Sequence, residues 1–225
     1  APQITICNVE GSQAPRLADT SVFMNAGPEV GVAATKTFTS SLTCLYLLAS
    51  YLGQSRGFLG HESIRSITNE LAKLPSQIDG ILNNKANYET IADEFFSKEN
   101  FLYLGRGIQH PIALEGALKL KEVSYIHAEG YPAGEMKHGP IALINKGMPV
   151  LAIALRDEAF SKMLNNIEEA RARDGTLIVV GTEGDRELKT RANHVILVPK
   201  ASPLLSPILT TMPLQLLAYY MAVRR

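Results

Sequence analysis

The segment "FLYLGRGIQHPIALEGALKLKEVSY", residues 101–125, decides the fold class. It opens with a short, continuously apolar run that ends in a glycine-rich turn, which is typical of a strand buried on both faces. From Pro111 onward, apolar residues recur at helical spacing. A buried strand followed at once by a helix is the repeating unit of a parallel sheet with helices packed on its faces.

The same pattern continues toward the C-terminus. Further strands are predicted at residues 148–155, 176–183 and 194–199. A helix is predicted over residues 158–175, where Gly175 ends it, and a last one over 204–223. The last helix is apolar nearly all round, and its two prolines, Pro207 and Pro213, set its start or kink it. We therefore predict an α/β fold, a three-layer αβα sandwich around a parallel sheet.

The N-terminal part looks like the end of another unit of this kind. Residues 4–9 and 21–27 are short, β-branched runs typical of strands, and residues 35–53 have a helical period with Gly53 as the expected C-cap. Residues 62–82 and 88–98 have weaker helical patterns. We divide the chain into residues 1–58, the end of a first domain, and 59–225, a second domain.

Composition excludes several classes of function. Lysine plus arginine and aspartate plus glutamate both number 22, so no net charge favours nucleic acid or an anionic membrane as partner. The two cysteines, Cys7 and Cys44, are too few for a disulfide framework or a zinc cluster, which favours a reducing, cytoplasmic setting. The longest apolar stretch, residues 42–53, falls short of the roughly 20 residues that span a bilayer. A small molecule or another protein is the expected partner.

Three charged residues of the segment 101–125 are candidates for proton transfer. Glu115, Lys119 and Glu122 stand at i, i+4 and i+7 and so share one stripe of the predicted helix, while Leu114, Ala117, Leu118 and Val123 are expected to face inward. A carboxylate beside a carbon acid can act as a general base, and a neighbouring lysine can keep it ionised. The competing interpretation is an exposed helix pair of opposite charges.

His138 lies in "EGYPAGEMKHGP", residues 129–140, whose glycines and prolines disfavour any regular element. Histidine can both give and take a proton near neutral pH. A solvated surface histidine is the alternative. The five histidines have no metal-ligand spacing, so we expect no metal.

Two glycine-rich turns could hold a polar ligand. "LGRG", residues 104–107, follows a strand at the place where parallel sheets bind ligands, but it lacks the full dinucleotide-binding spacing. In residues 26–42, Gly27, Gly31 and Thr35 could place amides and hydroxyls around a ligand. The alternative is a loop with Thr35 as helix N-cap.

Four stretches together resemble the isomerase half of the glucosamine-6-phosphate synthase (glutamine:fructose-6-phosphate amidotransferase) family. They are "CNVEGS", "AGPEVGVAATKTFTSSL", "MPLQLLAYYMA" and the long run from Leu104 to Ile144. The resemblance implies tandem sugar isomerase (SIS) domains, each a five-stranded parallel sheet between helices. One complete and one partial copy are then expected here, in a homodimer that binds a sugar phosphate.

The resemblance also implies residue roles. In that family, fructose 6-phosphate and ammonia form an imine, and a proton then moves from C1 to C2 to give glucosamine 6-phosphate in amino sugar biosynthesis. Glu122 is the implied base, with Glu115 and Lys119 as supporting polar groups. His138 is the implied acid-base group for opening the sugar ring, reaching the site of a neighbouring subunit. Val32 and Ala33 match backbone positions that border the sugar, and the chemistry implies no cofactor.

The chain departs from the family pattern in three places. It has no serine- and threonine-rich phosphate motif, no tail lysine for the Schiff base, and no N-terminal glutaminase cysteine, since Cys7 falls within a strand pattern. We therefore expect a part of a longer enzyme, inactive in isolation. A non-catalytic sugar-phosphate-binding module and a dimerising scaffold are the alternatives, because one fold serves many functions.

Overall fold

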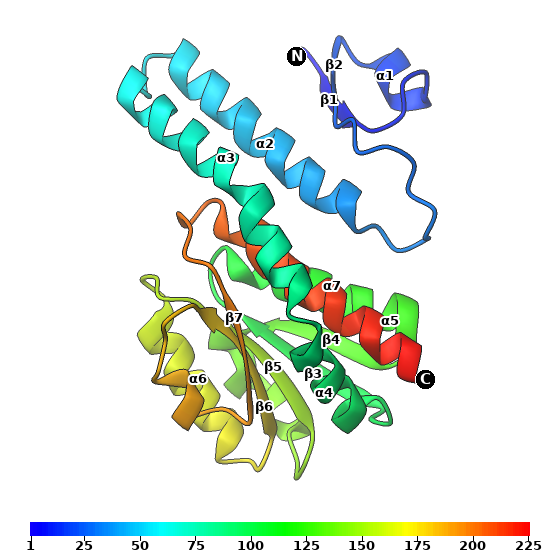
Figure 1. Ribbon diagram of the computed structural model, residues 1–225, viewed down its shortest axis with the longest axis vertical. Coiled ribbons are helices and arrows are strands. Elements are labelled where there is room, and N and C mark those ends of the chain that lie inside the picture. Colours follow the sequence, from blue (N-terminus) through cyan, green and yellow to red (C-terminus); the bar gives the residue numbers. More distant parts are fainter. The chain divides into compact units, whose positions relative to one another are not determined.

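The computed structural model describes all 225 residues and divides into two compact units, Ala1–Ala72 and Lys73–Arg225 (Figure 1). The division falls inside helix α3 (His61–Asn83), whereas the sequence predicted a boundary after residue 58, in the loop before this helix. Each unit is described by itself. None of the helices is long and apolar enough to cross a membrane.

The first unit contains a two-stranded parallel sheet. Strands β1 (Ile4–Cys7) and β2 (Thr20–Phe23) pair along their whole length, and α1 (Gln13–Leu17) connects them. Helix α2 (Lys36–Ser55) follows. Both strands and the helix confirm the predicted pattern.

The expected end of α2 at Gly53 is wrong, because the helix continues to Ser55. A Cβ atom at Gly53 would lie 2.8 Å from Leu59 Cδ1. The glycine therefore provides room for the following loop to fold back on the helix, rather than ending it.

The second unit is built on a five-stranded, fully parallel sheet in the order β4-β3-β5-β6-β7. Its strands are β3 (Asn100–Gly105), β4 (His127–Pro132), β5 (Pro149–Ala154), β6 (Thr176–Thr182) and β7 (His194–Val198). All six residues of β5 are buried, as expected of a strand covered on both faces.

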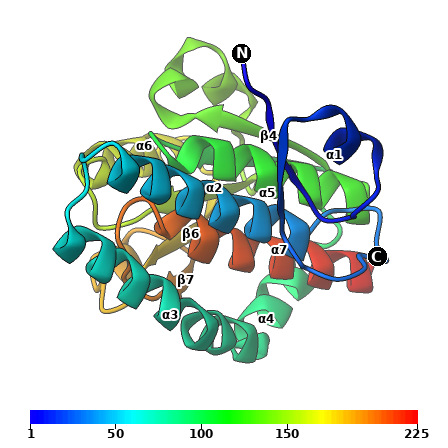
Figure 2. The same ribbon diagram turned by 90° about the horizontal axis from the view of Figure 1, so that it is seen from above.

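Helices cover both faces of this sheet (Figures 1 and 2). They are α4 (Lys85–Phe95), α5 (Gln109–Ser124), α6 (Phe160–Arg171) and α7 (Ser206–Arg224). Side chains alternate between the two faces. Leu102 and Leu104 of β3 pack in one core with α6, whereas the rings of Phe101 and Phe95 of α4 meet edge to face on the other side. This is the predicted three-layer sandwich.

Helix α7 is buried around most of its circumference, as its apolar sequence predicted. Pro207 lies in the first turn, where its missing N–H costs no hydrogen bond, and Pro213 lies inside the helix. In the two views of Figures 1 and 2, α7 lies beside α5.

The segment 129–140 does adopt regular structure, contrary to expectation. Its first residues belong to β4, an edge strand that pairs with β3 as far as Pro132. Two short 3₁₀ helices follow, Ala133–His138 and Pro140–Leu143. Pro132 is compatible with the last position of an edge strand, because a residue there need not donate to the ladder on its outer side.

Candidate functional site

Lys119 is the centre of a buried charge cluster on α5. Its residue exposure is only 4%, and its Nζ donates a 2.6 Å hydrogen bond to Glu122 Oε2. The same ammonium lies 3.5 Å from Glu115 Oε1, and the Glu115 side chain is 11% exposed. The interpretation as an exposed helix pair is therefore wrong, whereas the predicted common stripe is confirmed.

The two carboxylates differ in environment. Burial raises the pKa of Glu115 above its ordinary value, and the Lys119 charge opposes this only in part. Glu115 Oε1 is buried and has no hydrogen-bond partner, since the ion pair at 3.5 Å is too long to supply one. Glu122 is 33% exposed, so its carboxylate can meet a ligand while the buried ammonium neutralises its charge.

The inward face of α5 differs from the prediction. Ala117 is buried as expected, but Leu114 and Leu118 are exposed. A Cβ atom at Gly116 would lie 2.6 Å from a methyl group of Leu214 in α7 and 3.0 Å from the Tyr103 ring in β3. The inward face is thus the one that contains Gly116, because close packing against both α7 and the sheet requires a residue without a side chain there.

His138 is not joined to this cluster. It ends the first 3₁₀ helix, its side chain is 74% exposed, and its only ion-pair neighbour is Glu135, at 3.9 Å. Glu135 and Lys137 are exposed too. The proposed role of His138 therefore stays a prediction.

Val32 and Ala33 belong to the first unit, in the loop between β2 and α2. The loop is organised by Glu29, which accepts hydrogen bonds from the backbone N–H and the hydroxyl of Thr35 and from the hydroxyl of Thr37. Partial burial would raise the pKa of Glu29, but these hydrogen bonds outweigh it and lower the pKa to about 2. Thr35 is the N-cap residue of α2, but its hydroxyl makes no capping hydrogen bond to the helix. The Glu29 carboxylate instead accepts hydrogen bonds at the start of α2, which is the role predicted for the Thr35 hydroxyl.

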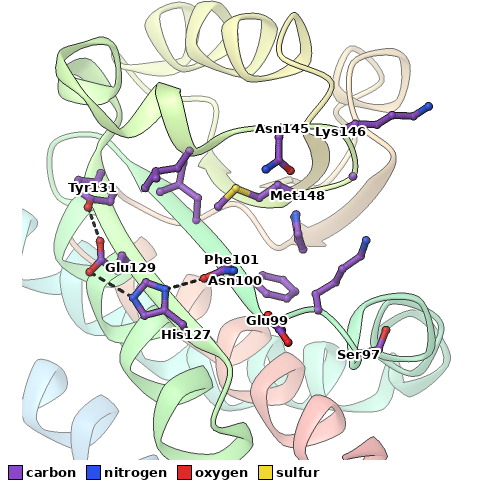
Figure 3. Close-up of a pocket in the computed structure, with 15 residues that line it drawn as sticks. Ser97, Glu99, Asn100, Phe101, His127, Glu129, Tyr131, Asn145, Lys146 and Met148 are labelled. Carbon is purple, nitrogen blue, oxygen red and sulfur yellow. Dashed lines mark hydrogen bonds and ion pairs between the residues drawn. The ribbon is translucent and has the colours of Figure 1, made fainter.

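Two cavities lie at opposite edges of the sheet, and the sequence indicated part of only one of them, the turn at residues 104–107. One, of about 550 Å³, lies at the amino ends of β3 and β5. There His127 bonds to Asn100 at 3.0 Å and lies 3.6 Å from Glu129, which accepts a hydrogen bond from Tyr131 (Figure 3).

The other, which we term the carboxyl-edge cavity, measures about 460 Å³ and is formed by residues that follow β3, β5, β6 and β7. The predicted "LGRG" turn contributes Arg106 and Gly107 to its wall. This is the edge at which parallel sheets usually bind ligands.

Residues 94–225 match the family model described as SIS domain. The chain belongs to the SIS domain family. The matched region contains the whole five-stranded sheet of the second unit, with the cluster on α5 and the carboxyl-edge cavity.

Individual relatives narrow the comparison. The SIS chain is 50% identical over 98% of its length to the glutamine--fructose-6-phosphate aminotransferase [isomerizing] of Chlorobaculum tepidum, and 50% identical over 97% to that of Aquifex aeolicus. It spans 36% of the length of each.

A solved structure, the C-terminal domain of glucosamine-fructose-6-phosphate aminotransferase from Francisella tularensis, is 40% identical. It superimposes with a TM-score of 0.92 over 98% of this chain and 62% of that one. The family resemblance and the SIS fold predicted from sequence are confirmed.

Proposed function

We propose that this SIS chain is the isomerase part of a glutamine–fructose-6-phosphate aminotransferase. In that role it converts fructose 6-phosphate and ammonia into glucosamine 6-phosphate for amino sugar biosynthesis. The observation that supports this most directly is the 2.6 Å hydrogen bond from the buried Lys119 ammonium to the partly exposed Glu122 carboxylate. An accessible carboxylate held by a buried ammonium suits a general base, which must be fixed in position and within reach of a substrate proton.

In this proposal Glu122 moves the proton between carbons. The imine at C2 acidifies a C1 hydrogen, which leaves as a proton to the Glu122 carboxylate. Its bonding electrons form the C1–C2 double bond while the C2–N π electrons pass to the nitrogen, which takes up a proton, so that an enaminol forms. Glu122 then returns its proton to C2, and the C1 hydroxyl loses its own proton to solvent and becomes the aldehyde. Lys119 holds the Glu122 carboxylate in place through its hydrogen bond, and Glu115 balances the Lys119 charge while Glu122 carries the proton.

Other parts of the proposal rest on family resemblance. His138, exposed at the end of its 3₁₀ helix, opens the sugar ring in the site of a second subunit. The working form in this proposal is therefore a homodimer. The family resemblance also gives it a cytoplasmic location. Val32 and Ala33 border the sugar through their backbones. The phosphate-binding turn, the imine-forming lysine and the glutaminase belong to other parts of the longer protein.

A chimera tests this function. Residues 1–225 replace the aligned segment of the Chlorobaculum tepidum relative, and glucosamine 6-phosphate is measured with fructose 6-phosphate and ammonia as substrates. We expect product from the chimera and a loss of about 100-fold or more in Glu122→Gln, the usual scale of a lost general base.

Lys121→Gln, an exposed neighbour on the same helix, is the matched control and is expected to leave the rate unchanged. Sugar-phosphate binding without product in the unmutated chimera would favour the non-catalytic binding module. Dimer formation with neither binding nor product would favour the scaffold.

A further inference from the structure

The 3₁₀ helix that carries His138, Ala133–His138, presents three different faces. A 3₁₀ helix has three residues per turn, so residues three apart share a face. Ala133 and Met136 form the inner face and are completely buried. Glu135 and His138 form the outer face, and their side chains are 66% and 74% exposed. The direction of His138 is therefore set by the rotation of this helix about its own axis.

The inner face of the 3₁₀ helix packs on α6. Ala133 and Met136 belong to the same hydrophobic core as Met163 and Ile167 of α6. Burial of apolar side chains is favourable but has no preferred direction. These contacts therefore hold the 3₁₀ helix against α6 without fixing its rotation, and directional contacts are needed for that.

The third face, formed by Gly134 and Lys137, supplies directional contacts. A Cβ atom at Gly134 would lie 3.2 Å from Arg106 Nη2 and 3.5 Å from its Cζ, so the guanidinium lies against the bare backbone of this glycine. Lys137 Nζ forms an ion pair with Glu169 Oε1 of α6, 2.8 Å away. Both residues of the third face thus meet a side chain from outside the 3₁₀ helix.

Asn166 of α6 joins these two contacts, and it is only 6% exposed. Its Oδ1 accepts a 2.8 Å hydrogen bond from Arg106 Nη1, and its Nδ2 donates a 3.1 Å hydrogen bond to Glu169 Oε2. Because the amide has one acceptor end and one donor end, only one orientation makes both hydrogen bonds. The contacts run without a gap from Arg106 to Lys137, and we term these two residues, with Asn166 and Glu169, the α6 bridge.

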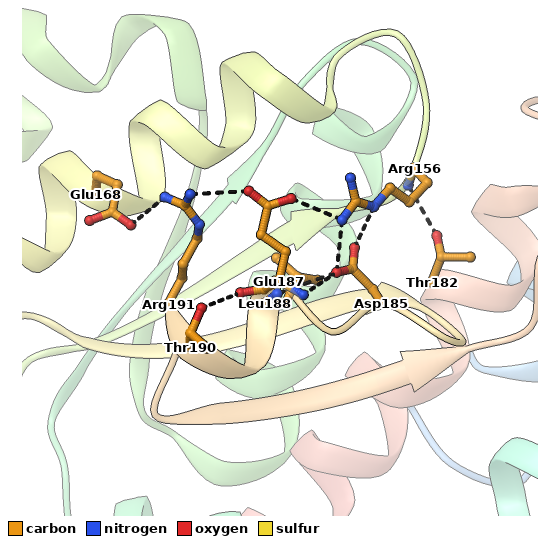
Figure 4. A network of polar contacts seen from close by, with 8 residues as sticks. All are labelled: Arg156, Glu168, Thr182, Asp185, Glu187, Leu188, Thr190 and Arg191. Atoms are coloured by element: carbon orange, nitrogen blue, oxygen red, sulfur yellow. Dashed lines mark hydrogen bonds and ion pairs between the residues drawn. The ribbon is translucent and has the colours of Figure 1, made fainter.

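Helix α6, which supports the bridge, is itself tied to the sheet connections (Figure 4). Arg191 donates a 2.8 Å hydrogen bond to Glu168, the neighbour of Glu169 on α6, and a 3.0 Å hydrogen bond to Glu187. Glu187 accepts a further one, at 2.9 Å, from Arg156 in the loop after β5. Since α6 is fixed to the segments that follow β5 and β6, it can serve as a rigid reference for the 3₁₀ helix.

The chain after His138 does not continue the 3₁₀ helix. Gly139 has a φ of 147°, a conformation that favours glycine, and a second 3₁₀ helix begins at Pro140. Because the backbone changes direction at Gly139, the second 3₁₀ helix does not share the axis of the first. The α6 bridge is therefore the polar support of the first helix on the side of α6.

We propose that Arg106 and Asn166 are positioning residues for His138. Through Gly134 and Lys137 they fix the rotation of the 3₁₀ helix, so that its outer face directs His138 away from the core. This inference rests on the proposed function, in which His138 opens the sugar ring in the site of a second subunit. A group that acts across a subunit boundary needs a fixed direction, because a displacement of about 1 Å can lower a rate by about 100-fold.

Hydrogen exchange of the 225-residue chain measures the positioning directly. We expect the backbone amides of the last turn, residues 136–138, to exchange about tenfold faster or more in Arg106→Gln and in Asn166→Leu, the scale of one lost charge-assisted hydrogen bond. Arg173→Gln and Asn165→Leu are the matched controls, because both residues are exposed and lie just after and within α6. Neither control should change the exchange.

Lys137→Gln keeps the test decisive if the other two bridge variants fail to fold. The Lys137 side chain is 62% exposed, so its substitution leaves the core intact. Loss of its ion pair with Glu169 should speed exchange of the last turn about twofold to fivefold, the scale of a surface ion pair. Unchanged exchange in the bridge variants would overturn the proposal.

Rates in the chimera test whether the bridge acts through His138. Arg106→Gln should lower the rate of glucosamine 6-phosphate formation about tenfold or more, but less than about twofold in a His138→Gln background. Fructose 6-phosphate also opens its ring spontaneously in water, so the His138→Gln chimera keeps a measurable rate. Equal losses in both backgrounds would show a structural role only and would overturn the proposal. A chimera that forms no product would refute the proposed function instead, and hydrogen exchange alone would then decide the positioning inference.

Discussion

Replacing Lys119 by methionine should destabilise the protein through the charges it leaves behind. Methionine keeps a similar length and volume but removes the ammonium between Glu115 and Glu122. Removing one partner of a buried ion pair costs about 3–5 kcal/mol. Glu122 is 33% exposed and can be rehydrated, so most of the cost falls on Glu115, whose side chain is 11% exposed. We therefore expect a loss of about 2–3 kcal/mol in the free energy of unfolding near pH 7.5.

The loss should depend on pH. Burial raises the pKa of Glu115 in the folded protein, so between the ordinary value and the raised one the folded state binds more protons than the unfolded state. The contribution of Glu115 to stability is therefore greatest below its unfolded pKa and falls as pH rises through the folded pKa. Without Lys119 to lower it, that pKa rises further, so the variant should lose less stability near pH 4.5 than near pH 7.5.

Urea unfolding followed by far-ultraviolet circular dichroism at both pH values measures this effect. Lys121→Met, at an exposed position of the same helix without an ion pair, is the control and should change stability by less than about 0.5 kcal/mol. The double variant Glu115→Gln/Lys119→Met should recover more than half of the loss, because the less accessible carboxylate is then neutral. A Lys119→Met variant as stable as the unmutated protein, or one equally destabilised at both pH values, would refute the reasoning.

Two glycine positions and one left-handed residue give further predictions for unfolding by urea. Gly105→Ala should lower the free energy of unfolding by about 3 kcal/mol or more, because the new Cβ would lie 2.3 Å from the backbone oxygen of Gln109. Gly80→Ala in α3 should raise it by up to about 1 kcal/mol, because the new Cβ meets no neighbouring atom within 4 Å. Equal effects of the two alanines would contradict this steric account. Tyr125→Gly should raise the free energy of unfolding by about 1 kcal/mol, because Tyr125 ends α5 in the left-handed conformation, at φ 59°, and its side chain is exposed. A neutral or destabilising result would mean that contacts of the Tyr125 ring stabilise the fold by more than its left-handed backbone destabilises it.

Much of the second unit could be predicted from sequence because its signals are local. The continuously apolar runs gave strands β3, β5, β6 and β7, since a parallel strand buried on both faces needs no polar alternation. Strand β4 was missed because "HAEGYP" contains few β-formers. Its strand conformation depends on pairing with β3, which is a tertiary interaction.

The spacing of Glu115, Lys119 and Glu122 placed all three on one stripe of a helix, and that part of the site followed from sequence alone. Spacing could not tell whether the stripe faced solvent or protein. That choice was decided by the packing of Gly116 against Leu214 and Tyr103, which sets the rotation of α5 on the sheet. The carboxyl-edge cavity is likewise a product of topology, because residues from four separate strand ends meet there only once the sheet has formed.

The amino-acid sequence by itself thus determined the order of most elements, the family and the identity of the charged residues on α5, because periodicity and residue spacing act within one element. The tertiary structure alone decided that Lys119 is buried between its two carboxylates and that Arg106, Thr182 and Lys200 line one cavity. Burial and proximity across the sheet depend on which faces pack together. Burial and proximity change pKa values and form binding sites, so the chemistry of this chain depends on its tertiary packing.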